Sequence, residues 1–226
     1  MVTGLIVAAG RSTRMGGAID KVLLEIAGAP ILVHSWWRFD KCDLVDSVVI
    51  VTRAELVDAV SEMGRTYQMQ KPFKVVVGGM ARQDSVWNGL QAVPNGTEIV
   101  AIHDAARPCI TEWTIRRTIE VAREKGAAIA AQPIVDTVKE SVDGMVINRT
   151  LDRSVLWAAQ TPQTFQYHII LRAYSIVQEK AITITDDAAA CEIIGVPVWL
   201  VRADKPNPKL TVPEDVPYIR GLLAEK

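Results

Sequence analysis

Three cationic residues, Arg11, Arg14 and Lys21, stand in a glycine-rich stretch of this sequence, directly after an apolar run. Residues 7–21 read VAAGRSTRMGGAIDK and include Arg14 and Lys21. Arginine can hold phosphate oxygens in a bidentate manner, and lysine acts on them as a point charge. Because Ala9 and Gly10 are small, a ligand can approach the main chain, whose N–H groups can hold an anion. The stretch predicts an anion-binding loop, with a solvated cationic turn as the alternative.

Two common phosphate-binding motifs are absent from this stretch. The GxGxxG motif of dinucleotide-binding proteins requires glycine where Ser12 stands, and the P-loop requires Gly-Lys-Ser/Thr where Gly16 is followed by Gly17. The sequence therefore disfavours a nicotinamide enzyme and a P-loop ATPase.

Polar residues also follow other predicted strands. HDAARP places Asp104, which can hold a divalent cation or a ribose hydroxyl, near Arg107, which can hold a phosphate. GGMARQDS, residues 78–85, places a glycine pair between a strand and a helix, which suits a pocket for a flat base and its sugar. Since ligands of open α/β sheets bind beyond the carboxyl ends of the strands, we expect these segments to share one pocket. Turn capping and surface charge are the alternatives.

The weaker candidates lie later in the chain. Thr161 and Thr185 offer hydroxyls to a polyol or a phosphate, and Lys209 follows two prolines that restrict its presentation.

The candidate charged set is Arg14, Lys21, Arg107, Arg153 and Lys209, with Asp104. It lacks an obvious base or nucleophile, and His103 has no serine or cysteine nucleophile beside it. Such a set suits nucleotidyl transfer, in which positioning and charge stabilisation dominate. A phosphate monoester acceptor, with a second pKa of about 6, is already an oxyanion and needs no general base.

Short β-branched runs alternate with helical segments, as in an α/β fold with a Rossmann-like, mostly parallel twisted sheet flanked by helices. The expected strands are 5–8, 47–52, 74–77, 99–102, 127–131 and 196–201. The expected helices are 30–39, 82–92, 111–125 and 167–178, with a further helix beginning near Pro213.

Residues 134–153 alternate around Asp143-Gly144, the signal of a two-residue hairpin turn. A lone hairpin is marginal in water, so we expect this projecting arm to need a covering surface, such as a second subunit.

Composition excludes several classes of function. The 226 residues are 49% hydrophobic and 23% charged with a net charge of −1, so no global field attracts nucleic acid or an acidic membrane surface. No apolar segment approaches the ~20 residues of a membrane span. Three scattered cysteines without a CxxC pair argue against a disulfide framework or a zinc site. A reducing cytoplasm is the expected location.

The motifs together resemble one enzyme family. VAAGRSTRMGGAIDK, GGMARQDS, HDAARP, DTVK, TLDRSVLWAAQTPQTF, TITDDAA and KLTVPEDV are similar, in order and spacing, to the 2-C-methyl-D-erythritol 4-phosphate cytidylyltransferases of the non-mevalonate isoprenoid pathway. The resemblance implies a single nucleotidyltransferase domain over residues 1–226. It also implies transfer of CMP from CTP to methylerythritol phosphate, with release of pyrophosphate and aid from Mg²⁺ or another divalent cation.

The resemblance assigns roles to individual residues. The catalytic set would be Arg14 and Lys21, which stabilise the α-phosphate, and Arg153 and Lys209, which position the acceptor phosphate. The nucleotide would be held by Ala8, Ala9, Gly10, Gly78, Gly79 and Ser85, with Asp104 serving the ribose or the metal. The acceptor side would comprise Ala105, Arg107, Thr137, Arg153, Thr161 and Thr185. The family is a homodimer, so Thr137 and Arg153, on the arm at about 134–153, would act across the interface.

Two departures from the family pattern affect the site. Asp20 stands before Lys21 where the family usually has proline, and Met80 stands where an acidic residue is often found. A carboxylate beside the lysine can pair with it and weaken its hold on phosphate. A ribitol 5-phosphate cytidylyltransferase, a nucleotide-sugar pyrophosphorylase and a nucleotide-binding regulator that has lost catalysis remain as alternatives.

Overall fold

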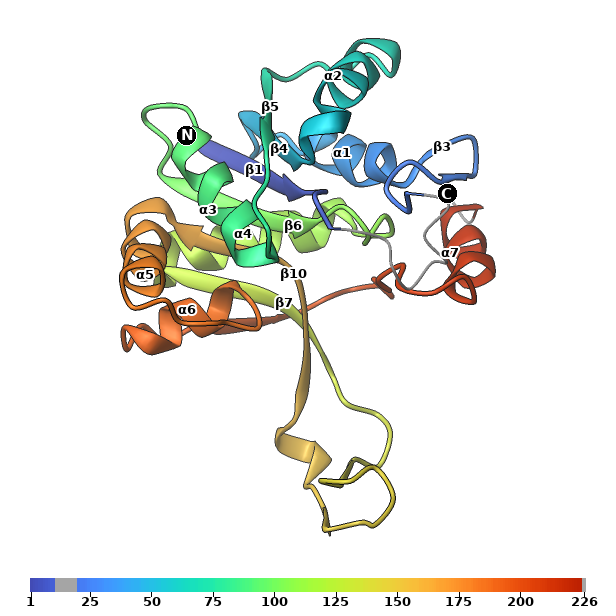
Figure 1. Ribbon diagram of the computed structural model, residues 1–226, viewed down its shortest axis with the longest axis vertical. Helices are drawn as coiled ribbons and strands as arrows, with labels where there is room; N and C mark the ends of the chain where they lie inside the picture. The colour runs from blue at the N-terminus through green and yellow to red at the C-terminus, as the bar shows by residue number, and fades with distance from the viewer. Residues whose placement is uncertain (11–19, 225–226) are drawn as a thin grey trace.

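A computed structural model describes residues 1–10 and 20–224, which form a seven-stranded sheet covered by helices (Figure 1). The strands are β1 (Val2–Val7), β4 (Ser47–Thr52), β5 (Phe73–Val77), β6 (Ile99–Asp104), β7 (Ala127–Pro133), β10 (Trp157–Gln166) and β11 (Trp199–Arg202). Their order is β11-β7-β10-β6-β1-β4-β5. β10 runs antiparallel to both of its neighbours, and the other neighbouring pairs are parallel. The expected mostly parallel α/β fold is confirmed.

Apolar side chains cover both faces of the sheet, which explains why its central strands are almost entirely apolar. Successive residues of β1 show this, because Leu5 belongs to one buried cluster and Ile6 to the other. The Ile6 cluster includes side chains of α1 (Ile31–Lys41), α2 (Val57–Thr66) and α4 (Glu112–Lys125). The Leu5 cluster includes side chains of α3 (Arg82–Ala92), α5 (Tyr167–Glu179) and α6 (Asp187–Ile193).

The remaining elements are small or lie at the edge of the sheet. α7 (Asp215–Ala224) packs Ile219 and Leu223 in a separate cluster with Ile26 and Ile31. The short strands β2 (Glu25–Ile26) and β3 (Ala29–Pro30) pair with each other, and two 3-10 turns span Ala54–Leu56 and Arg153–Val155. None of the described helices is both long and apolar enough to cross a bilayer.

Local sequence signals account for the best-predicted helix, α4. The hydroxyl of Thr111 accepts the N–H of Thr114 at 3.1 Å and caps the helix start. Gly126 ends the helix at φ +96°, a conformation that glycine adopts without strain. Both ends match the prediction from the sequence.

Other boundaries differ from the sequence predictions. The strand expected at 196–201 is β11, which begins only at Trp199, and the last helix begins at Asp215 rather than near Pro213. The predicted elements did not include β10, α2 or α6. β10 carries Pro162 and the buried polar residues Gln163 and Thr164, which obscure the pattern of a strand.

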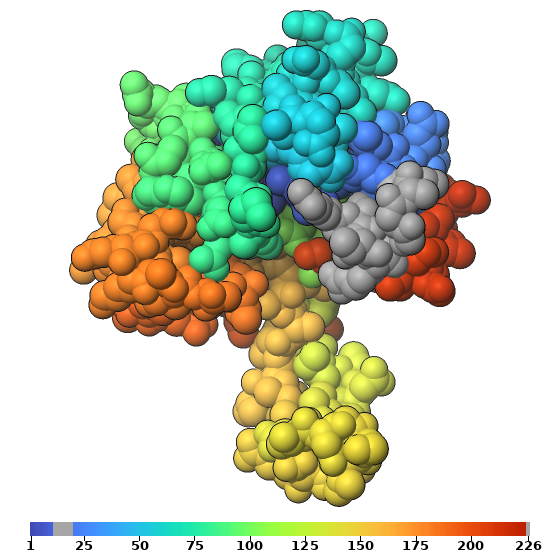
Figure 2. Space-filling view, in the orientation of Figure 1, coloured from blue at the N-terminus to red at the C-terminus, as the bar shows by residue number. Residues whose placement is uncertain are grey.

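The hairpin arm projects away from the sheet as a separate lobe (Figures 1 and 2). Its strands β8 (Lys139–Glu140) and β9 (Arg149–Thr150) have two residues each, with residues 141–148 between them. The two-residue turn predicted at Asp143-Gly144 is therefore wrong. The Asp143 carboxylate instead accepts the N–H groups of Met145 and Val146 at 2.8 and 2.9 Å, which shapes a longer loop.

Candidate active site

A cavity of about 560 Å³ lies at the carboxyl ends of β1, β4, β5 and β6, where the sequence predicts the ligand. The predicted residues that line it are Ala8, Ala9, Gly10, Lys21, Gly78, Gly79, Ser85, Asp104 and Lys209. Arg53, Glu55, Met80 and Arg82 also line it and were not predicted to contact the ligand. Arg14 lies outside the described residues. A wider groove of about 770 Å³ beside Trp113 and Tyr218 contains none of the residues predicted for the site.

The segments that follow β1 and β5 meet at the wall of the cavity through small residues. A Cβ atom on Gly78 would lie 2.5 Å from the Cβ of Ala9 and 2.8 Å from the Oγ of Ser85, which is closer than atoms tolerate. The Ser85 hydroxyl accepts the Gly79 N–H at 3.1 Å and donates to the Ala81 carbonyl at 3.1 Å. Ser85 therefore fixes the conformation of the glycine loop through the main chain of Gly79 and Ala81, and its hydroxyl has partners within the protein.

Asp104 is the charged centre of the cavity floor. Its Oδ1 accepts from Arg82 Nε at 3.0 Å and its Oδ2 from Lys209 Nζ at 2.7 Å, and its side chain is 11% exposed. Burial would raise the pKa of Asp104, but the charges and hydrogen bonds of Arg82 and Lys209 outweigh it and hold the pKa well below its usual range. Asp104 is thus a carboxylate at neutral pH.

Arg82, the first residue of α3, is the functional residue that the sequence analysis missed. Its guanidinium makes a bidentate pair with the fully buried Asp187 at 2.9 and 2.8 Å, while its Nε holds Asp104. Burial would lower the pKa of Arg82, but the charges of Asp187 and Asp104 raise it well above its usual value. An arginine opening a helix directly after a glycine pair at a strand end was the signal available in the sequence.

Lys21 and Asp20 follow the part of the first loop that lies outside the described residues. Lys21 lines the cavity. The Asp20 carboxylate accepts from the Arg53 guanidinium and from the Val22 N–H, the latter at 3.2 Å. Arg53 follows β4, so this ion pair joins the segment just before Lys21 to the end of β4 beside the cavity. Asp20 therefore has a cationic partner other than the lysine next to it.

Several residues predicted for the acceptor side face the protein interior. Arg107 donates from Nη1 to the Asn207 carbonyl at 2.7 Å. Ala105 is fully buried, and its carbonyl accepts the Ser35 hydroxyl at 2.8 Å. Thr161 is 4% exposed, and its hydroxyl contacts the Asp104 N–H and the His103 ring. None of Ala105, Arg107 and Thr161 lines the cavity, which differs from the expectation that they line the acceptor side.

The remaining predicted acceptor residues lie away from the cavity of their own chain. Thr185 is exposed and precedes Asp186, the residue that caps α6. Thr137 and Arg153 are exposed on the arm, where Arg153 Nη1 donates to the Val135 carbonyl. The cavity within one chain thus brings together the predicted nucleotide residues with Lys21 and Lys209, and leaves the arm residues apart.

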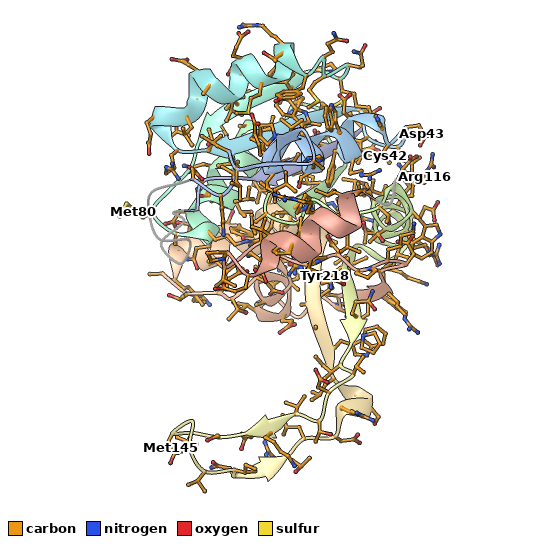
Figure 3. The ribbon with its side chains drawn as sticks, turned by 90° about the vertical axis from the view of Figure 1, so that its right-hand side faces the viewer. Cys42, Asp43, Met80, Arg116, Met145 and Tyr218 are labelled. Carbon is orange, nitrogen blue, oxygen red and sulfur yellow. The ribbon has the colours of Figure 1, made fainter. Side chains whose placement is uncertain are left out.

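Possible metal ligands in the described part of the chain form one close group, Cys42, Asp43 and Glu112. Arg116 donates to both of these carboxylates, and burial raises the pKa of the Cys42 thiol (Figure 3). This group is an ion-pair cluster with its own cation. Asp104 is also paired with cations, Arg82 and Lys209, but it is an ionised carboxylate that lines the cavity. Mg²⁺ usually takes one or two carboxylates, with substrate phosphates and water supplying the other ligands, so Asp104 is the residue that would hold it.

Comparison with known proteins identifies one enzyme family over nearly the whole chain. The sequence model of the 2-C-methyl-D-erythritol 4-phosphate cytidylyltransferase family matches residues 2–225. Enzymes of that name from Alkaliphilus oremlandii and Caldanaerobacter subterraneus subsp. tengcongensis are 43% and 42% identical to the chain, over 94% and 95% of its length and 90% and 95% of theirs. The crystal structure of 4-diphosphocytidyl-2C-methyl-D-erythritol synthase from Anaerococcus prevotii superposes with a TM-score of 0.87 at 27% identity, covering 99% of this chain and 96% of that one. The chain therefore belongs to the 2-C-methyl-D-erythritol 4-phosphate cytidylyltransferase family.

Proposed function

We propose that this protein transfers CMP from CTP to 2-C-methyl-D-erythritol 4-phosphate, giving 4-diphosphocytidyl-2-C-methyl-D-erythritol and pyrophosphate. The observation that carries the proposal is the cavity at the strand ends, in which two lysines and an ionised aspartate accompany a wall of glycine and alanine. Membership of the family supports both the reaction and its substrates.

The small residues of the cavity wall suit the cytidine. Ala9, Gly10 and Gly79 leave the main chain open to a flat base, while Ser85 keeps the glycine loop in place. The N–H groups of Ala8 and Gly78 already donate to carbonyls of β4 at 2.7 Å, so these two residues would contact the ligand through other atoms. Asp104 lines the same cavity, where a ribose hydroxyl or a metal would meet it.

The transfer step needs charge rather than a base. An oxygen of the acceptor phosphate attacks the α-phosphorus of CTP, a new P–O bond forms, and the bond from the α-phosphorus to the oxygen bridging to the β-phosphorus breaks. Pyrophosphate leaves with the electron pair of that bond. Arg14 and Lys21 would stabilise negative charge that is greatest at the pentacoordinate phosphorus, and Lys209 would position the acceptor phosphate. Lys209 must first exchange its contact with Asp104 for a phosphate, which ties its release to ligand binding.

The proposal includes a metal, a dimer and a location. Asp104 and the triphosphate would hold Mg²⁺, which neutralises phosphate charge when bound.

The arm exposes the apolar side chains Val142, Met145, Val146 and Ile147, which a second copy of the chain would cover. In such a homodimer Thr137 and Arg153 would reach the partner's cavity. A reducing cytoplasm remains our expectation for its location.

A paired acceptor assay tests the function. Pyrophosphate release from CTP is measured with 2-C-methyl-D-erythritol 4-phosphate and, separately, with ribitol 5-phosphate, each with Mg²⁺. We expect turnover with the first acceptor and little with the second. Equal or faster turnover with ribitol 5-phosphate would overturn the acceptor assignment. CTP binding without turnover on either acceptor would instead identify a nucleotide-binding regulator.

A further inference from the structure

His103 is a buried residue beside the cavity to which the proposed reaction gives no role. It is the penultimate residue of β6 and is fully buried. Its Nδ1 lies 3.0 Å from the Thr161 hydroxyl, and its Nε2 lies 3.2 Å from the carbonyl oxygen of Arg107. The ring therefore contacts residues on both sides of Asp104, one on β10 and one on the turn after β6.

The hydrogen bonds of this group have one consistent arrangement. A carbonyl can only accept, so Nε2 of His103 carries a proton and donates it to Arg107. The buried ring in this tautomer has its one proton on Nε2, which leaves a lone pair on Nδ1. The Thr161 hydroxyl must then donate its single proton to Nδ1. Its oxygen is left to accept, which it does from the Asp104 N–H at 3.1 Å.

Beyond the last residue pair of β10 and β6, the hydrogen bonds of Thr161 take the place of main-chain pairing between these two strands. β10 pairs with β6 from Gln166 opposite Ile99 to Gln163 opposite Ile102, and no pair of these two strands follows Ile102. The Asp104 N–H thus lies past the end of the ladder, and the Thr161 side chain takes the place of a backbone acceptor. A buried N–H without an acceptor is destabilising, so this contact constrains the main chain that carries the Asp104 carboxylate.

We propose that His103 is a positioning residue for nucleotide binding, which acts through Thr161 to fix the main chain of Asp104 at the cavity floor. Thr161 consequently supports the main chain of Asp104. The inference rests on the proposed function in taking CTP as the ligand of the cavity. A role at Asp104 affects CTP binding in the absence of acceptor, whereas a direct contact to the acceptor does not.

The test is calorimetric titration of CTP with Mg²⁺ and no acceptor, using two matched pairs of variants. Thr161→Val keeps the side-chain shape and loses the hydroxyl, and we expect it to weaken CTP binding about tenfold. Thr161→Ser keeps the hydroxyl and should restore affinity to within about threefold, since the donor and acceptor both remain. His103→Leu removes the Nδ1 acceptor, whereas His103→Asn offers an oxygen, Oδ1, near that position. We therefore expect His103→Leu to bind CTP more weakly than His103→Asn does.

Thermal unfolding of each variant separates positioning from folding. Titrations are run well below the lowest unfolding midpoint, where a merely structural residue would leave the CTP dissociation constant unchanged. Unchanged CTP affinity in both Thr161→Val and His103→Leu would overturn the inference, as would a change confined to the KM for the acceptor. If Thr161→Val does not fold, the comparison of His103→Leu with His103→Asn decides, and if His103→Leu does not fold, the comparison of Thr161→Val with Thr161→Ser decides. Failure of the wild-type protein to bind CTP would contradict the proposed function itself.

Discussion

Replacing Asp104 by asparagine removes a carboxylate that Arg82 and Lys209 share in the cavity floor. Breaking a buried ion pair from one side costs about 3–5 kcal/mol. Because the Lys209 side chain is 36% exposed and can turn to water, we discount this to about 2 kcal/mol of unfolding free energy at pH 7. Arg82 keeps its bidentate pair with Asp187, so the fold itself should persist.

The pH dependence of this loss gives a sharper test. The folded pKa of Asp104 is depressed below its unfolded value, so its stabilisation is complete above the unfolded pKa of about 4 and declines as the pH falls through the folded pKa. Urea unfolding is compared for the wild type and Asp104→Asn from pH 7 to pH 3. We expect a constant difference from pH 7 to about 5, shrinking below about pH 4 by at most about 1.4 kcal/mol per pH unit.

Asp43→Asn is the matched control, because Asp43 is exposed and pairs with Arg116 on the surface. Its effect on unfolding should be much smaller than that of Asp104→Asn at every pH. A difference between the wild type and Asp104→Asn that does not shrink down to pH 3, or a stabilising effect at pH 7, would refute the reasoning about the Asp104 ion pairs.

Three further predictions concern the loops and the arm. Lys21→Ala should lower kcat by at least about tenfold while CTP still binds in calorimetry, since its charge acts mainly on the transition state; an unchanged kcat would remove Lys21 from the catalytic set. Gly78→Ala should destabilise the protein by about 1–3 kcal/mol and weaken CTP binding, because the added Cβ overlaps Ala9. Gly221→Ala, where nothing lies within 4 Å, should leave stability equal or higher, and equal thermal midpoints for the two glycine variants would contradict the packing argument. Mixing Arg153→Ala and Lys21→Ala subunits should recover activity if the arm acts at the partner's cavity, and absence of recovery in confirmed heterodimers would count against it.

The sequence predicted those elements whose signals are local. The central strands are apolar because both faces of the sheet are covered, and α4 carries its own capping residues, Thr111 and Gly126. The cavity lining could be predicted because glycine and charge follow the ends of several parallel strands.

Features set by distant contacts could not be predicted. β10 contains buried Gln163 because its amide oxygen accepts the N–H groups that begin α6, at 2.9 Å each, and no local pattern indicates such a contact. Arg82 gains its role only because folding places Asp104 and Asp187 on either side of it. Thr161 was expected to meet the acceptor, but its hydroxyl already has partners in β6.

Oxygen-isotope transfer tests the central claim most directly, because that claim names the bond that forms. The acceptor, 2-C-methyl-D-erythritol 4-phosphate, is labelled with ¹⁸O in its phosphate and incubated with CTP, Mg²⁺ and the protein, and both products are analysed by mass spectrometry. If an oxygen of the acceptor phosphate attacks the α-phosphorus of CTP, the cytidylyl product retains all of the label and pyrophosphate has none. Label in pyrophosphate, or formation of no cytidylyl product, would contradict the account.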